Sequence, residues 1–513
     1  GSDRMFLFVT FFCVAGASSP SATTSFGTLH GNGLGGGISE YLGIPYAKPP
    51  TGELRFRDPQ DWNQTYPQSS RDATKVGSEC VSLQQLMGKE DCLFMNVWSP
   101  FTSASAMAPV LLFVHGGAFV EGSGNSFNGT TLAYHTNSVV VTFNYRLGSL
   151  GFLQATKGHG NFGLKDQRSA FRYVQSQIVN FGGDPNKVMI FGESAGAISV
   201  LLHLTTPKSF GLYQSVLSES GFAKIHPQEV AMKQTAGYLK CAGCADQKDV
   251  VACLQSKSLA TLGYAESCVS SSGDPFTKPG WSPSVDFDEF SANPLDLLKA
   301  GKFNAEVPVA LGSNNREGSL FVLPFHLFKM SATAYKEWLV SALQNSGEPF
   351  SNATVDSILE VYPPQTDPTS DNRQTAVKLI GDSTFICGTR QTARLISTYS
   401  KKQVFVYHYD YKLKSDKSPA SFGVYHGSEL PLVFGYNVNG LTPTFTSDET
   451  LLSGNIQAMW ASFARSSNPG KIWPNYGNQT DTVLKIQGGS TPLVQEVHYN
   501  KKYCDFWETI QQQ

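Results

Sequence analysis

The stretch of the sequence that most clearly suggests chemistry is Gly-Glu-Ser-Ala-Gly at residues 192–196. An apolar strand pattern at 188–191 precedes it, and an apolar helix pattern at 197–204 follows it. A serine at such a sharp turn is lifted off the end of a sheet, and the next helix directs its N-terminus toward developing negative charge. Ser194 is therefore the candidate nucleophile for acyl transfer.

A serine hydroxyl is a poor nucleophile unless a base accepts its proton and an acid orients that base. In proteins that carry this turn, the acid and then the histidine follow the serine along the chain. His426 lies in a glycine-flanked loop after a strand pattern at 404–409, which suits a base at the end of a sheet. His408 lies inside that strand pattern, where a structural role is expected, but the pattern leaves His408 and His498 open as alternatives.

Glu317 is the candidate acid. It follows a strand pattern at 307–311 and a short loop, and catalytic groups of open α/β sheets lie at the carboxyl ends of strands. An ordinary solvated loop acid would show the same pattern, so this alternative stays open.

A candidate oxyanion site follows the strand pattern at 110–114, where the chain reads His-Gly-Gly-Ala-Phe at 115–119. Glycines let backbone N–H groups approach a substrate closely. Such a loop, together with the N–H of Ala195, can hold a tetrahedral oxyanion.

These groups need a sheet to position them, and strand patterns alternate with helix patterns along the chain. The runs at 110–114 and 139–143 are apolar throughout, as in strands covered on both faces, and residues 165–179 form an amphipathic helix pattern. Further strand patterns lie at 216–217, 307–311, 404–409 and 483–486. This alternation predicts an α/β fold with a large, mostly parallel, twisted central sheet flanked by helices. We expect one catalytic domain over 18–513, with inserted loops and helices at 241–290.

The N-terminus predicts a secretory signal. Residues 6–14 are apolar, small residues follow at 15–17, and 1–17 is read as a leader whose first four residues precede Met5. No later segment is apolar for the ~20 residues that a membrane span needs. The net charge is −2 without a basic stripe, so nucleic acid is not an expected partner.

Cysteines and glycosylation sequons also favour export. Cys13 lies in the leader, and the remaining eight cysteines are an even number, so we expect disulfides to use them all. Four Asn-X-Ser/Thr sequons predict glycosylation at Asn63, Asn128, Asn352 and Asn478.

Two further patterns suggest cofactors but lack the right context. Residues 31–36 match Gly-X-Gly-X-X-Gly, but Gly43 and Pro45 interrupt any following helix, so dinucleotide binding is not expected. Cysteines at 241, 244, 253 and 268 could bind zinc, but disulfides are favoured in an exported chain. We therefore expect no cofactor and no metal.

Taken together, the motifs resemble the type-B carboxylesterase/cholinesterase family. Residues 181–196 are similar to its nucleophile signature, and 90–97 are similar to its second signature, with Met95 as a departure. The segments at 42–47, 144–148 and 163–167 also match, and the resemblance extends from about residue 26 to 507. It implies an α/β-hydrolase fold and hydrolysis of small-molecule carboxylic esters through an acyl-enzyme.

The resemblance also implies roles for individual residues. Ser194 falls on the nucleophile, Glu317 on the triad acid and His426 on the base. The implied oxyanion donors are Gly117, Ala118 and Ala195, where many relatives have a third glycine in place of Ala118. The implied disulfides are Cys80–Cys92, Cys387–Cys504 and Cys253 with Cys241 or Cys244. Implied structural ion pairs join Arg55 to Glu90 and Arg146 to Asp166.

One departure bears on the substrate. Cholinesterases carry a tryptophan before the second signature that stacks on a quaternary ammonium, whereas the loop from Cys80 to Cys92 has none. We therefore expect uncharged esters as substrates. The alternatives are a lipase for long-chain acylglycerols and a catalytically inactive adhesion or storage protein on this fold.

Overall fold

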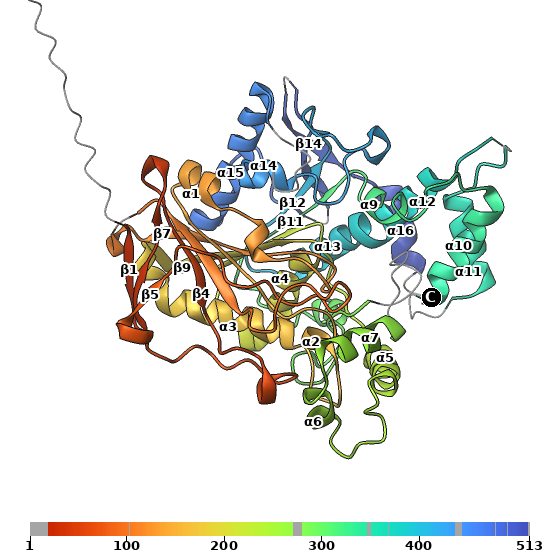
Figure 1. Cartoon of the computed structure of the whole chain (residues 1–513). Coiled ribbons are helices and arrows are strands. Elements are labelled where there is room, and N and C mark those ends of the chain that lie inside the picture. Colours follow the sequence, from red (N-terminus) through yellow and green to blue (C-terminus); the bar gives the residue numbers. More distant parts are fainter. Residues whose placement is uncertain are drawn as a thin grey trace, which may run out of the picture.

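The computed structural model describes residues 19–101, 103–269, 280–345, 350–367, 369–436, 444–477, 479–489 and 491–510. The leader and the sequon at Asn478 lie outside these residues. The main sheet has 11 strands in the order β14-β13-β12-β11-β10-β9-β7-β8-β6-β4-β3 (Figure 1). Its strands are β3 Asn32–Gly33, β4 Ser39–Pro45, β6 Phe94–Ser99, β7 Ala108–Val114, β8 Val139–Phe143, β9 Gly183–Glu193, β10 Ser215–Glu219, β11 Val309–Asn314, β12 Val404–Tyr409, β13 Thr482–Ile486 and β14 Leu493–Val497.

The remaining elements surround this sheet. A second, three-stranded sheet contains β1 Ser21–Thr24, β2 Gly27–His30 and β5 Ser70–Asp72. The α-helices are α1 Thr130–Thr136, α2 Gly148–Phe152, α3 Phe162–Gln177, α4 Ala195–Thr205, α5 Gln228–Cys241, α6 Val250–Gln255, α7 Leu259–Val269, α8 Pro294–Lys299, α9 Ser319–Val322, α10 Ala332–Asn345, α11 Asn352–Val361, α12 Arg373–Ile380, α13 Cys387–Tyr399, α14 Leu430–Phe434, α15 Ser447–Ser466 and α16 Lys501–Ile510. No helix among the described residues is long and apolar enough to cross a membrane.

The centre of the main sheet is parallel, which confirms the predicted α/β fold. Strands β8, β7, β9, β10, β11, β12 and β13 pair in parallel, while β6, β4 and β3 at one edge and β14 at the other are antiparallel. The register places Glu219 beside Glu193 on one side and beside Gly312 on the other. The carboxyl ends of β9, β10 and β11 therefore meet at one edge, where Ser194 follows β9 and Glu317 lies just after β11.

Both faces of the central strands are buried because helices cover each side. Along β7, Leu111 and Phe113 belong to one core with α1, α14 and α15, while Leu112 and Val114 belong to another with α3 and α4. Figure 1 shows α3 on one side of the sheet and α1, α14 and α15 on the other. Side chains of a strand alternate between its faces, so a strand between two helical layers reads as apolar throughout.

Three disulfides join segments around this framework: Cys80–Cys92, Cys244–Cys253 and Cys387–Cys504. Of the two partners left open for Cys253, the structure therefore selects Cys244. Cys241 and Cys268 carry free thiols in this structure, which differs from the expectation that all eight cysteines are paired.

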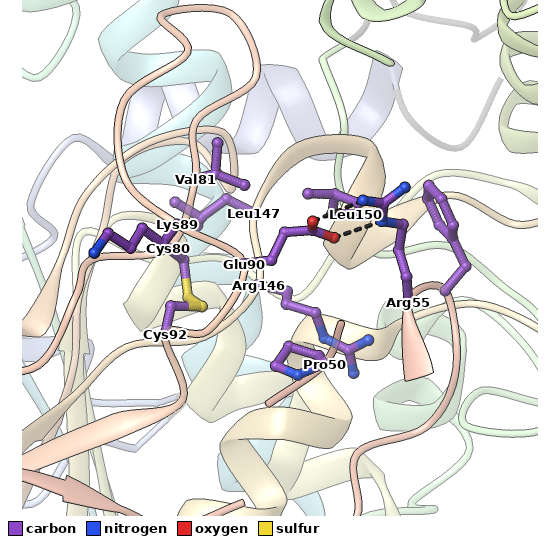
Figure 2. Close-up of a pocket in the computed structure, with 11 residues that line it drawn as sticks. Pro50, Arg55, Cys80, Val81, Lys89, Glu90, Cys92, Arg146, Leu147 and Leu150 are labelled. Atoms are coloured by element: carbon purple, nitrogen blue, oxygen red, sulfur yellow. Dashed lines mark hydrogen bonds and ion pairs between the residues drawn. A yellow bond between two sulfur atoms is a disulfide. The ribbon is translucent and has the colours of Figure 1, made fainter. Parts of the chain in front are cut away.

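The loop closed by Cys80 and Cys92 carries Glu90, which forms a largely buried ion pair with Arg55 (Figure 2). Arg55 Nε lies 2.5 Å from Glu90 Oε1, and Arg146 Nη2 lies 2.7 Å from Asp166 Oδ1. Arg55 also donates to the carbonyl of Lys257 at 2.7 Å, which ties the loop to the region of α6 and α7. Both ion pairs implied by the family resemblance are thus present.

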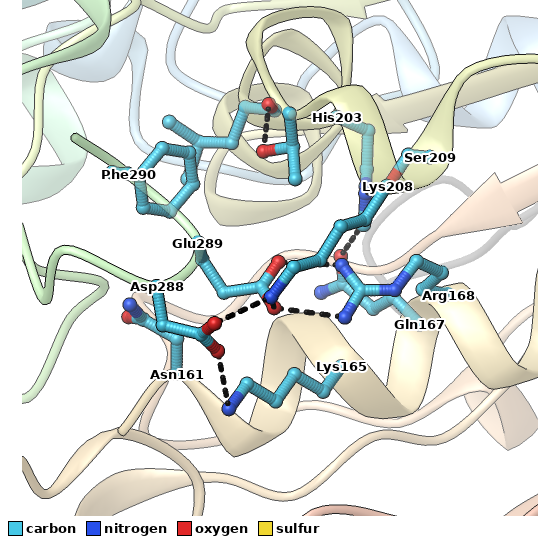
Figure 3. Close-up of polar contacts among 12 residues, drawn as sticks. Asn161, Lys165, Gln167, Arg168, His203, Lys208, Ser209, Asp288, Glu289 and Phe290 are labelled. Carbon is cyan, nitrogen blue, oxygen red and sulfur yellow. Dashed lines mark hydrogen bonds and ion pairs between the residues drawn. The ribbon is translucent and has the colours of Figure 1, made fainter. Parts of the chain in front are cut away.

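The first half of helix α3 buries its polar side chains as well as its apolar ones (Figure 3). Lys165 and Arg168 on α3, together with Lys208, pair with Asp288 and Glu289 of a crossing segment. We call these five residues the α3 cluster. Their ion pairs cover the charged side chains near the start of the predicted amphipathic helix. The helix also ends at Gln177, where a 3₁₀ turn begins.

Candidate active site

Ser194 occupies the predicted turn between β9 and α4. Its φ of 57° and ψ of −122° lie outside the usual regions for a residue with a Cβ, so the surrounding structure must hold it there. A Cβ added at Gly196 would lie 1.9 Å from the carbonyl oxygen of Val114, and one added at Gly192 would lie 2.6 Å from the same atom. The two glycines are therefore required because the turn presses against the end of β7.

The loop after β7 runs beside Ser194. A Cβ added at Gly116 would lie 3.0 Å from the Ser194 Cβ, and Gly117 has a φ of +110°. Ala118 has a φ of 52°, which an alanine adopts only under constraint. Ala195 is the first residue of α4, and the first N–H groups of a helix have no acceptor within it. The structure therefore brings both predicted donor segments to the serine.

His426 and Glu317 form a buried pair. His426 Nδ1 lies 2.6 Å from Glu317 Oε2, and Glu317 is completely buried. The other carboxylate oxygen of Glu317 accepts from the Asn314 N–H and from the Ser220 hydroxyl, each at 2.6 Å. The sequence prediction missed both of these partners. Their positions in the sequence could have indicated them. Ser220 directly follows β10, and Asn314 is the last residue of β11, so both lie at the carboxyl ends of strands.

The second nitrogen of His426 lies beside Glu193, the residue before Ser194. His426 Nε2 is 3.1 Å from Glu193 Oε1, but it makes no directed hydrogen bond to any of the described residues, Ser194 included. Ser194 follows Glu193 directly in the chain, so this contact places the imidazole at the turn that carries the candidate nucleophile. Apo enzymes commonly show such loose geometry between nucleophile and base.

The alternative histidines have other partners. His408 Nδ1 lies 2.9 Å from Glu496 Oε2, and its ring stacks on Tyr499 at 3.7 Å between centroids. His498 Nδ1 lies 3.2 Å from Asp481 Oδ2. Of the three histidines, His426 is the one that pairs with Glu317.

Four buried carboxylates lie close together at these strand ends, and three of them, Glu193, Glu317 and Glu429, act on the His426 imidazole. We call His426, Glu193, Glu219, Glu317 and Glu429 the strand-end cluster. Burial raises the pKa of Glu193 to about 7, opposed by the charge of His426 and assisted by that of Glu317. Burial, with Glu193 and Glu317 nearby, also raises the pKa of Glu429 to about 8. The Trp460 indole donates to Glu219 at 2.6 Å, yet burial keeps the pKa of that carboxyl well above its usual range.

The pKa of His426 moves in the same direction for a different reason. Burial alone lowers the pKa of an imidazole, but Glu193 and Glu317 outweigh burial and raise the pKa of His426 to about 9. The cluster therefore favours the imidazolium form, the form a general base acquires when it takes a proton.

Aromatic rings surround His426. The Phe321 and Phe385 rings lie 5.0 and 4.6 Å from the His426 ring, and Phe222 lies 6.0 Å from Phe385. These rings limit water near the imidazole, and interactions between charges are stronger where water is excluded.

The Cys80–Cys92 loop lies next to the oxyanion loop. Gln85 Nε2 donates to Glu121 Oε2 at 3.0 Å, and the carbonyl of Glu121 would collide with a Cβ at Gly117. Val81 and Leu83 point into the protein, whereas Leu86 and Met87 are exposed. This loop therefore presents aliphatic rather than aromatic side chains on its outer face.

Comparison with known proteins agrees with this geometry. The profile of the Carboxylesterase family matches residues 18–507. Acetylcholinesterase from Bungarus fasciatus is 31% identical, covering 96% of this chain and 86% of the relative. The para-nitrobenzyl esterase of Bacillus subtilis is 31% identical, covering 91% of this chain and 95% of the relative. A solved PNB esterase structure superposes with a TM-score of 0.81 at 28% identity, covering 95% of this chain and 100% of that one. The chain belongs to the carboxylesterase family, and it is a serine ester hydrolase.

Proposed function

We propose that this enzyme hydrolyses uncharged carboxylic esters, with Ser194 as nucleophile, His426 as general base and Glu317 as the acid that orients it. The observation that carries the proposal is the buried 2.6 Å contact between His426 Nδ1 and Glu317, held beside the strained turn at Ser194. Chain order, serine then acid then histidine, also agrees.

The proposed reaction has two halves. His426 Nε2 turns from Glu193, accepts the Ser194 proton and allows Oγ to attack the ester carbonyl, while Glu317 holds the Nδ1 proton. The N–H groups of Gly117, Ala118 and Ala195 bind the oxyanion. The imidazolium then protonates the leaving alcohol, and a water activated by His426 releases the acid. The methyl group of Ala118 narrows the space beside the alcohol group.

Three measurements test this assignment. An organophosphate should label Ser194, as identified by mass spectrometry of the labelled peptide. Ser194→Ala should lower kcat by several orders of magnitude, on the order of 10⁴- to 10⁶-fold. A profile of p-nitrophenyl esters by acyl length then defines the acyl preference. Labelling of another serine, or an active Ser194→Ala variant, would contradict the proposal.

A lipase is a second candidate, and one observation favours it. Leu327 and Phe328, a short distance along the chain from Glu317, are 74% and 87% exposed, and Phe325 nearby is 44% exposed. Exposed apolar side chains close together suit contact with a lipid surface. A lipase would lose about tenfold or more activity on emulsified tributyrin in L327S/F328S but keep its rate on p-nitrophenyl acetate. Leu451→Ser, an exposed leucine on α15, is the matched control.

We also propose that the mature chain is exported and glycosylated. Asn63, Asn128 and Asn352 are exposed, so each is accessible to a glycan. The three disulfides suit an oxidising compartment. Expression in a secreting host, followed by glycosidase treatment and peptide mapping, should locate glycans at these asparagines. An unmodified chain retained in the cytosol would contradict this.

A further inference from the structure

Two cysteines outside the three disulfides face each other across a pair of helices. Cys241 is the last residue of α5, and Cys268 is the next-to-last residue of α7. The two helices pack against one another, and both thiols reach solvent, Cys268 more than Cys241.

The helical periodicity of α5 places Cys241 on the face of the helix that packs against the end of α7. Gly237 lies one turn before Cys241 on the same face, and a Cβ added there would lie 2.8 Å from Val269 Cγ1. A hydrogen bond with the Cys268 thiol raises the pKa of Cys241. Tyr264, one turn before Cys268, has its pKa raised by the charges of both Cys268 and Cys241. Contacts from both helices therefore place the two sulfurs side by side.

We propose that Cys241 and Cys268 are a covalent modification site that a disulfide oxidant closes to a fourth disulfide, joining α5 to α7. The Cys268 thiolate attacks a low-molecular-weight disulfide such as oxidised glutathione, forming a mixed disulfide and releasing one thiolate. The Cys241 thiolate then attacks Cys268 Sγ and releases the second thiolate. Two protein thiols are oxidised, one small disulfide is reduced, and the two protons end on the released thiols.

The competing partner for Cys241 is already occupied. Cys253 is joined to Cys244, which leaves Cys268 as the thiol within reach. The exposed Cys268 meets the oxidant first, and the partly buried Cys241 resolves the mixed disulfide. This order follows from access, which decides the sulfur that reacts first.

The proposed Cys241–Cys268 disulfide would restrain a helix pair that packs against the loops beside the candidate active site. A Cβ added at Gly263 on α7 would lie 2.8 Å from the carbonyl oxygen of Leu83, so α7 packs directly on the Cys80–Cys92 loop. Glu266, also on α7, accepts from the Ser149 N–H at 3.0 Å. Since Gln85 of the same loop bonds Glu121, joining α5 to α7 stiffens the support of the oxyanion loop.

The experiment uses the full chain, incubated with excess oxidised glutathione, alkylated under denaturing conditions without reduction, and mapped by mass spectrometry. The expected result is a peptide pair linked through Cys241 and Cys268, with Cys244–Cys253 unchanged. Alkylation of both cysteines in the oxidised sample would overturn the proposal. Stable glutathione adducts on either cysteine, or a link between Cys241 and Cys253, would overturn it equally.

Thermal unfolding gives an independent readout. Oxidation should raise the Tm of the wild-type chain by about 2–5 °C, since the new bond restrains the unfolded chain. Cys268→Ser and Cys241→Ser should each abolish this rise while keeping the basal esterase rate, because neither residue belongs to the catalytic machinery. The linked peptide and the Tm are measured without substrate, so their failure is distinct from a failure of the proposed catalysis.

Discussion

The strand-end cluster is buried and the α3 cluster is partly buried, and the two differ in how their charges are paired. In the α3 cluster three cations face the carboxylates of Asp288 and Glu289, and Arg168 reaches Glu289 at 2.5 Å. Burial alone would raise the pKa values of Asp288 and Glu289. Hydrogen bonds and charge from Arg168, Lys165 and Lys208 outweigh burial and lower these pKa values. In the strand-end cluster one imidazole accompanies four carboxylates, and the pKa values of Glu193 and Glu429 are raised.

The pKa values of two buried histidines show the same difference between the two clusters. His203 lies next to the α3 cluster, bonded to Ser209 at 2.8 Å and Gln167 at 3.0 Å, and burial with the charge of Arg168 lowers its pKa well below the usual value. Carboxylates raise the pKa of the equally buried His426 to about 9. Each carboxylate thus has a cationic partner in one region, whereas an excess of carboxylates raises the pKa of the imidazole in the other.

The strongest change in turnover is expected when Glu317, the proposed orienting acid, is replaced. Glu317→Gln keeps the size of the side chain but removes the charge that faces Nδ1 of His426, so kcat should fall by about 10³- to 10⁴-fold. Steady-state kinetics on p-nitrophenyl acetate measure the change. Ser220→Ala, which removes one hydrogen bond to Glu317, is the matched control and should cost no more than about 10- to 100-fold. Near-normal turnover in Glu317→Gln would assign the acid elsewhere.

The next effect concerns the α3 cluster and should appear in stability. Arg168→Met leaves Glu289 buried without its best partner, so the free energy of unfolding should fall by about 3–5 kcal/mol. Urea unfolding measures this loss. Lys208→Met is the control, since its side chain is 46% exposed against 9% for Arg168, and it should cost less than about 1 kcal/mol. Equal losses of unfolding free energy in the two variants would show that the buried and the exposed ion pairs contribute equally to stability.

A smaller effect should appear in the pH profile of the strand-end cluster. As the proposed base, His426 must be neutral to accept the Ser194 proton, so kcat/KM should rise with pH as His426 loses its proton, with a midpoint near the pKa of about 9. Glu193→Gln removes a charge that raises this pKa, so the rising limb should move to lower pH. Glu429→Gln should move it less, because Glu429 contributes less to the pKa of His426. A limb that stays in place or moves upward in Glu193→Gln would show that Glu193 does not act on His426.

The smallest expected effect concerns the charge of the substrate. The Cys80–Cys92 loop offers Val81, Leu83, Leu86 and Met87 but no aromatic face for a quaternary ammonium. The kcat/KM for acetylcholine should therefore exceed that for its neutral 3,3-dimethylbutyl analogue by less than about tenfold, or 1.4 kcal/mol. A larger preference would reveal a cation site formed elsewhere.

Much of the fold and part of the candidate site could be predicted because their signals are local. The strand patterns at 139–143 and 404–409 match β8 and β12 in full, since strands buried on both faces are mostly apolar along their whole length. The turn at Ser194 was predictable because its glycines, preceding strand and following helix are contiguous. The burial of polar side chains in the first half of α3 was not, because the segment that covers them lies more than a hundred residues along the chain.

The mostly parallel sheet and the turn at Ser194 follow from the sequence, since short-range sterics and periodic burial specify them. The folded chain was needed to show that Cys253 pairs with Cys244, that Ser220 and Asn314 bond Glu317, and that Glu193 faces His426. These contacts join residues from separate strands and loops. The register of β9, β10 and β11 brings their ends together, and register arises from the packing of the whole sheet rather than from any one strand.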